Sequence, residues 1–197
     1  MNKLKAINSE FENQKFVKKD FSNQNYSNAS FVDCLFENCN FTSSNFNNVK
    51  FQNSIFKNCN LSLIKLEKSR LVEVFFEECK LVGIQFFKCD QFLLSFKFKK
   101  CLLESCNFSD MVLKNTSFKE SVVRRCDFIN TELFRANFDK TDLINTKFHH
   151  VNLKEASFLN AINYSIDPFI NKIQKAKFSK PDVYSLLDFL DIDITDD

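Results

Sequence analysis

Large apolar residues recur at every fifth position along most of this chain. An uninterrupted run of 16 such positions, all Phe, Tyr or Leu, extends from Phe11 to Phe86, and 14 more follow from Leu93 to Phe158. An amphipathic helix repeats every 3.6 residues and a half-buried strand every 2 residues. A five-residue period fits neither element, so the pattern predicts a repeat architecture in which every unit has the same role.

The residue two positions before each of these centres is mostly small, as at Cys34, Cys39 and Ser44, and the other three places of each unit are mainly polar. We therefore expect the centre and the small residue to point inward and the other three to face water. Cys39, Cys59 and Cys79 stand 20 residues apart, which is a spacing of four units.

The five-residue register slips once, near residues 87–92. Seven residues instead of five separate Phe86 from Leu93. With these two extra residues counted, Phe98 and the later centres stay in phase with the coils before the slip. The slip therefore predicts an outward bulge in one continuous helix.

The units CLFEN, CNFTS, RANFD and EASFL resemble the pentapeptide-repeat family over roughly Phe11 to Ala161. The resemblance implies an all-β fold, a right-handed quadrilateral β-helix with four units per coil, closed by short C-terminal helices. It divides the chain into an N-terminal cap (1–10), the β-helix (11–162) and a C-terminal cap with a dimerisation segment (163–197).

After Ala161 the pattern predicts two short helices, one starting at Asp167-Pro168 and one after Ser179, and then a strand at 190–194. The ending YSLLDFLDIDI resembles the closing segment of the quinolone-resistance (Qnr-type) pentapeptide proteins, and VGIQFFKC resembles their glycine break. The resemblance implies a homodimer. Its candidate interface residues are Val183, Leu186, Leu187, Phe189, Leu190, Ile192 and Ile194.

The composition contains no recognisable catalytic or metal-binding arrangement. The small inward sites hold the eight cysteines in parallel, so they cannot converge on a zinc ion, and the chain has only one glycine, which rules out a glycine-rich phosphate loop. We expect His149 and His150 to face water. We therefore predict no enzyme activity, no cofactor and no metal.

Resemblance to the Qnr-type proteins implies binding to DNA gyrase and topoisomerase IV, protection from quinolones, and imitation of DNA by an acidic rod. The net charge of the chain argues against imitation of DNA, because the chain up to Lys180 has 27 basic and 19 acidic residues. A basic rod would repel a surface that binds DNA phosphates. The alternative is an interaction scaffold with another partner and no role at topoisomerases.

The start MNKLKAINSEF has no apolar signal region and no apolar run is long enough to span a membrane, so we expect a cytoplasmic protein without membrane contact. Lys and Arg are scattered, so no direct binding of nucleic acid is expected. Phe75, Phe87, Phe92 and Phe134 stand at outward places or in the slip and are the candidates for a partner site.

Overall fold

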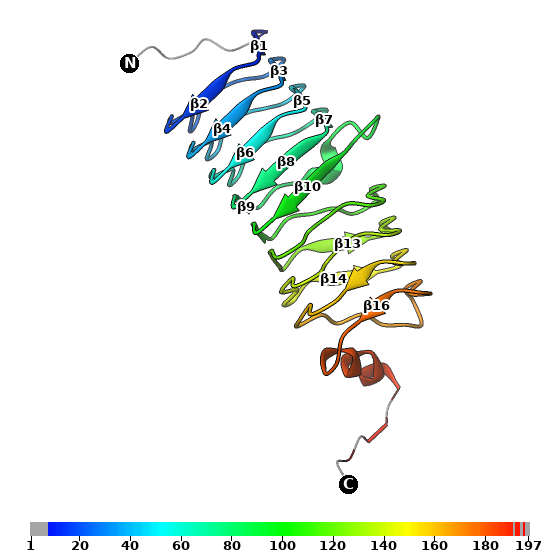
Figure 1. Cartoon of the computed structure of the whole chain (residues 1–197). Coiled ribbons are helices and arrows are strands. Elements are labelled where there is room, and N and C mark those ends of the chain that lie inside the picture. Colours follow the sequence, from blue (N-terminus) through cyan, green and yellow to red (C-terminus); the bar gives the residue numbers. More distant parts are fainter. Residues whose placement is uncertain (1–7, 191, 194, 196–197) are drawn as a thin grey trace.

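The computed structural model describes residues 8–190, 192–193 and 195. The chain winds into parallel coils that stack along a rod, with one helix at the C-terminal end (Figure 1). Strand pairs join residues 20 apart, as Phe36 with Phe56, or 22 apart across the slip, as Phe76 with Phe98. This confirms the predicted all-β helix and its 20-residue coil.

Most strands have only three residues, because each is one side of a coil. They are β1 (Glu10–Glu12), β2 (Lys15–Val17), β3 (Ser30–Val32), β4 (Leu35–Glu37), β5 (Lys50–Gln52), β6 (Ile55–Lys57), β7 (Arg70–Val72), β8 (Val74–Glu77), β9 (Lys80–Val82), β10 (Phe96–Lys99), β11 (Leu102–Glu104), β12 (Val122–Arg124), β13 (Asp127–Ile129), β14 (Lys147–His149), β15 (Ser157–Phe158) and β16 (Lys177–Phe178). The short 3-10 helices are η1 (Phe86–Lys88) and η2 (Asp182–Phe189).

Phenylalanine rings form columns inside the coils. In the longest column each ring stacks on the next, with centroid distances from 4.7 to 5.3 Å. The column contains Phe16, Phe36, Phe56, Phe76, Phe98, Phe118, Phe138, Phe158 and Phe178. Rings of adjacent columns meet edge to face, as Phe108 and Phe118 do at 86°. Edge-to-face and offset-stacked pairs each add about 0.5 to 1.5 kcal/mol beyond area burial.

The small inward residues link each coil to the one before it. Ser44 Oγ donates to the carbonyl of Phe21 at 2.7 Å, Cys59 Sγ to that of Phe36 at 3.4 Å, and Asn171 Nδ2 to that of Phe148 at 3.0 Å. Each donor lies 23 residues after its acceptor. Because a buried carbonyl without a partner is costly, this place favours a small side chain that can donate a hydrogen bond.

The corners of the coils are made by residues with left-handed backbone conformation. Among the described residues 31 non-glycine residues have φ between 49° and 60°, and 15 of them are Asn or Asp. The left-handed region costs most L-residues about 1 to 2 kcal/mol, and Asn and Asp adopt it most readily. This explains how the coil turns with a single glycine, Gly83, which has φ 70° at the same kind of corner.

The slip forms an outward bulge at residues 91–95, as the sequence predicted, and the coil phase is kept. Ser95 N–H donates to the Leu71 carbonyl at 2.9 Å, and Phe96 pairs with Val74, so these five residues lie opposite only three, 71–73. The predicted inward place of Leu93 is wrong, because Leu93 is 66% exposed. Leu94 packs against the core instead.

The side chain of Gln91 explains why the bulge is tolerated. Its Oε1 accepts from Val112 N–H at 3.3 Å, and its Nε2 donates to the Asp110 carbonyl at 3.1 Å. One amide side chain thereby satisfies a main-chain donor and a main-chain acceptor of the following coil. The residues after Gln91 can then leave the ladder without exposing unpaired groups on that coil.

The coil continues beyond Ala161, where the apolar pattern breaks. Residues Lys177 and Phe178 pair with Ser157 and Phe158, and Asn171 is buried in the small inward place. The helix predicted at Asp167 is therefore wrong. After this coil, η2 is the second predicted helix, and no strand follows it in the described residues 190, 192 and 193.

Candidate interaction surfaces

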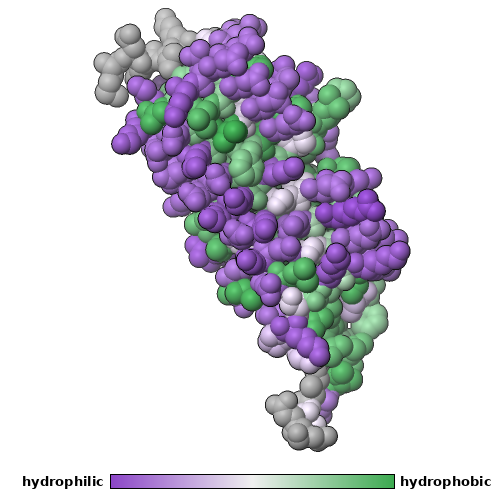
Figure 2. Space-filling model, viewed as in Figure 1, coloured by the Kyte–Doolittle hydropathy of each residue, from purple (hydrophilic) through white to green (hydrophobic). Residues whose placement is uncertain are grey.

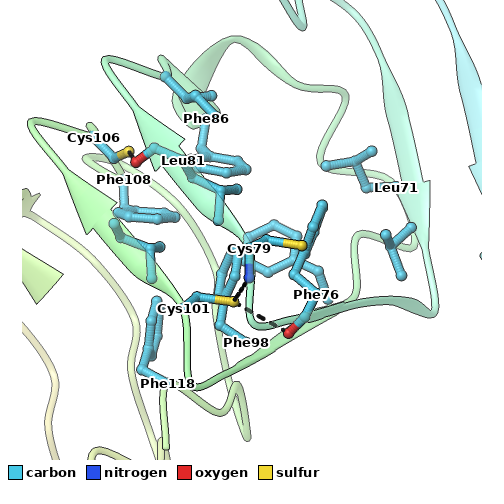
Figure 3. Close-up of a cluster of buried hydrophobic side chains, with 14 of the residues drawn as sticks. Leu71, Phe76, Cys79, Leu81, Phe86, Phe98, Cys101, Cys106, Phe108 and Phe118 are labelled. Atoms are coloured by element: carbon cyan, nitrogen blue, oxygen red, sulfur yellow. Dashed lines mark hydrogen bonds between the residues drawn. The ribbon is translucent and has the colours of Figure 1, made fainter. Parts of the chain in front are cut away.

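The cysteines lie in the core, where they support the coils. All eight are buried and free, and four of them form a ladder, Cys39, Cys59, Cys79 and Cys101. In this ladder Cys79 N–H donates to Cys101 Sγ at 3.4 Å (Figure 3). Cys101 Sγ in turn donates to the carbonyl of Phe76 at 3.4 Å. Burial raises the pKa of Cys89 to about 12, so this thiol is neutral at physiological pH. In the described part of the chain no three His, Cys, Asp or Glu residues converge as metal ligands.

The histidine pair lies on the surface, as the sequence predicted. His149 and His150 are both exposed, and their rings meet edge to face at a centroid distance of 4.2 Å. His150 occupies a left-handed corner, with φ 55°. His149 is the last residue of β14, so the pair lies where this strand ends and the corner begins.

Charged side chains form ladders of alternating sign along the outside of the rod. Nine of the ten ion pairs of the described residues join neighbouring coils. Glu77, for example, lies between Lys57 at 3.5 Å and Lys99 at 3.4 Å. Desolvation opposes ionisation of Glu77, but the hydrogen bonds and charges of these two lysines together lower its pKa, so the carboxylate stays charged. The acids are thus interleaved with bases and form no continuous acidic stripe on these ladders.

The four phenylalanines predicted as a partner site differ in their exposure and in their surroundings. Phe92 is 69% exposed in the bulge and Phe87 is 39% exposed in η1. Phe75 is half-buried in β8 between Ile55 and Lys97. Phe134 is half-buried beneath the guanidinium of Arg135, whose carbon lies 4.7 Å from the ring centroid.

A groove beside the bulge brings Phe75 together with apolar residues that the sequence did not single out. Its volume is about 470 Å³, and Phe75, Leu94 and Val112 provide apolar lining between Lys97 and Lys114. Leu93 and Val112 are exposed by 66% and 53%. Leu93 was missed because it fits the inward register, and Val112 because only the stacking of coils brings it to the bulge.

The C-terminal segment is the second apolar surface. In η2, Val183, Leu186 and Leu187 are half-buried, while Phe189, Leu190 and Ile192 are exposed, and Ile194 lies outside the described residues. Figure 2 shows hydrophobic residues gathered near this end of the rod, below a largely hydrophilic surface. This segment as a dimer interface stays a prediction. No helix in the described residues has the length and hydrophobicity of a membrane span.

Two family profiles match the chain. The pentapeptide repeat region matches residues 29–97, and pentapeptide repeats (8 copies) match residues 131–162, together about half of the chain. No curated protein matches the sequence.

Solved structures match over nearly the whole length. A trypsin-treated variant of QnrB1, a plasmid-mediated fluoroquinolone resistance protein, is 20% identical with a TM-score of 0.67, over 97% of this chain and 92% of that chain. HetL of the cyanobacterium Nostoc sp. strain PCC 7120, a pentapeptide repeat protein involved in heterocyst differentiation regulation, is 15% identical with a TM-score of 0.51, over 86% and 85%. At these identities the likeness concerns the fold. With both repeat profiles and this fold, the chain belongs to the pentapeptide-repeat family.

Proposed function

We propose that this chain is a non-catalytic protein-binding rod of the Qnr type, and that its partner is DNA gyrase or topoisomerase IV. The likeness to trypsin-treated QnrB1, which extends over nearly all of both chains, is the observation that supports this partner. Binding would protect the topoisomerase from quinolones.

The bulge and its groove are the surface that we assign to the contact. Phe92 and Leu93 project from an otherwise charged surface, and the groove of Phe75, Leu94 and Val112 lies beside them. An exposed group of large apolar residues on a polar surface is typical of a protein-binding site. Burying Phe92 and Leu93 against a partner would gain about 1.5 to 3 kcal/mol for each side chain.

The charge ladders favour a contact of this kind over imitation of DNA. Glu37 and Glu77 each bind a lysine of another coil, as do Glu78 and Asp127. Such pairing leaves little negative potential to replace DNA phosphates on the enzyme. The same observation favours the second candidate function, an interaction scaffold whose partner is not a topoisomerase.

The test is a gyrase supercoiling assay with and without ciprofloxacin, across a titration of the purified protein. The informative variant lacks Gln91 and Phe92, which removes the bulge. Its control is Phe169→Ser, because Phe169 has the same 69% exposure as Phe92 but lies far from the bulge in the sequence.

We expect the wild type and Phe169→Ser to rescue or inhibit supercoiling at low micromolar protein, and the deletion variant to lose this effect. Equal activity of the deletion variant would exclude the bulge as the contact while leaving gyrase as the partner. No effect of the wild type on gyrase or on topoisomerase IV would reject the topoisomerase and leave the scaffold, whose partner would then be sought by pull-down.

A further inference from the structure

Four basic side chains meet at one corner of the rod. Lys50, Lys68, Arg70 and Lys88, here called the basic corner, line one open hollow of about 530 Å³. Asp90 is the one acidic residue among the residues lining this hollow. The five-residue pattern does not reveal this cluster, because its members are 2 to 38 positions apart and only the stacking of coils brings them together.

Like charges stand opposite each other in the basic corner. Lys50 is the register partner of Arg70 on neighbouring strands β5 and β7, and Lys68 N–H donates to the Lys88 carbonyl at 2.8 Å. Like charges at directly opposed positions destabilise a parallel stack. The ion-pair ladders described above alternate in sign instead, as in Lys57, Glu77 and Lys99. The basic corner therefore departs from the alternation of sign in those ion-pair ladders.

One carboxylate partly compensates the four cations. Asp90 Oδ2 accepts from Arg70 Nε at 3.0 Å, and the pKa of Asp90 is lowered by the Phe92 N–H and by Arg70, so Asp90 is charged. Within residues 8–190, Lys50, Lys68 and Lys88 have no ion pair. Since Asp90 engages Nε of Arg70, the two Nη groups remain to donate to a ligand.

We propose that the basic corner binds a small polyphosphate, a ligand with two or three linked phosphate groups. Three uncompensated charges match such an anion, lysines bind phosphate as point charges, and an arginine fork donates to two phosphate oxygens. The hollow has the size of small-molecule sites, about 300 to 1,000 Å³. The ligand would also remove the repulsion between the stacked cations.

The basic corner is too short along the rod for a nucleic acid to be its main ligand. The next residues in the Lys50–Arg70 ladder are Ser30 on one side and Asp90 on the other, and Asp110 follows Lys88 on the next coil. The cations therefore span three coils, or about 10 Å at the spacing of stacked strands. Tight binding to DNA takes about 6 to 10 phosphate contacts along a longer surface.

Calorimetric titration with inorganic tripolyphosphate tests the proposal on the full chain. The test variant is Lys68→Ala/Lys88→Ala. The control is Lys140→Ala/Lys154→Ala, which removes the same charge from two exposed lysines that have no ion pair within residues 8–190. A parallel titration uses a short DNA duplex, and thermal unfolding checks that both variants fold.

We expect saturable one-site binding to the wild type, a loss of about tenfold or more in the test variant, and a change under about twofold in the control. The test variant should unfold at the same temperature or a higher one without ligand, because it lacks the repulsion. Absence of saturable binding, equal weakening in both variants, or tighter binding of the duplex at the same lysines would each overturn the proposal. The gyrase assay has no bearing on these outcomes.

Discussion

The rings of Phe118 and Phe138 lie 4.9 Å apart with an angle of 1° between their planes, and both side chains are fully buried. They are successive steps of the longest phenylalanine column. Because Phe98 stacks on the other side of Phe118 at 5.3 Å, a change at this position affects three coils at once.

Phe118→Asp is expected to unfold the rod. The substitution places an unpaired carboxylate among stacked rings and removes a buried aromatic side chain, which together cost well over about 4 kcal/mol. Circular dichroism during urea unfolding measures the effect. Phe92→Asp is the control, since Phe92 is 69% exposed and its replacement should leave stability within about 0.5 kcal/mol. Unchanged stability of Phe118→Asp would refute the inward column.

Deletion of Gln91 and Phe92 is expected to restore a regular coil. Leu93 already stands five residues before Phe98, and after the deletion it would also stand five residues after Phe86 instead of seven. It could then take the inward place from which the bulge now excludes it. Main-chain groups would replace the two hydrogen bonds of the Gln91 side chain to Asp110 and Val112. Burial of Leu93 should leave the free energy of unfolding unchanged or raise it by up to about 2 kcal/mol.

Urea unfolding checks this deletion against a matched one, removal of Asn115 and Thr116 from a regular coil. The control leaves that coil two residues short, breaks its ladder and should be strongly destabilised. A bulge deletion that costs more than about 1 kcal/mol would contradict the role given to Leu93.

Leu187→Asp is expected to give a monomer with intact coils. Leu187 is half-buried in η2, which follows the last coil, so a carboxylate there should disrupt the predicted dimer while leaving the phenylalanine columns in place. Light scattering gives the mass, and thermal unfolding reports on the coils. Leu159→Asp, on an outward position that is 38% exposed, is the control. A wild-type monomer, or a dimer of Leu187→Asp, would reject the tail interface.

The stability of the rod is expected to fall in alkaline solution through the buried thiol of Cys89. Burial raises the pKa of Cys89 from 9.0 to about 12, so the unfolded chain releases this proton first as the pH rises. The stabilisation is complete below pH 9 and is lost between pH 9 and 12, by up to about 1.4 kcal/mol per pH unit.

Urea unfolding of the wild type and of Cys89→Ala at several pH values isolates this thiol from other titrating groups. The stability difference between the two proteins should change in favour of Cys89→Ala as the pH rises above 9. A difference that stays constant up to about pH 11 would contradict the burial of Cys89.

The sequence alone determined the repeat, the inward columns and the phase of the coils on both sides of the slip. These features follow from the five-residue period, because the place of a residue such as Phe98 within its own unit determines that its ring points inward. The preceding coil does not change that place. The five-residue period gave the wrong place for Leu93, which fits the inward register but lies exposed in the bulge. It failed again after Ala161, where Asn171 and Phe178 continue the coil without an unbroken apolar pattern.

Only the tertiary structure decided which outward residues meet. Lys50 and Arg70 are 20 positions apart, as are Lys57 and Glu77, yet one pair repels and the other attracts. The period of five leaves the outward places free to vary, since water solvates almost any polar side chain there. Closure of the 20-residue coil then brings these side chains into register. The charge ladders, the groove at the bulge and the basic corner all arise from that stacking.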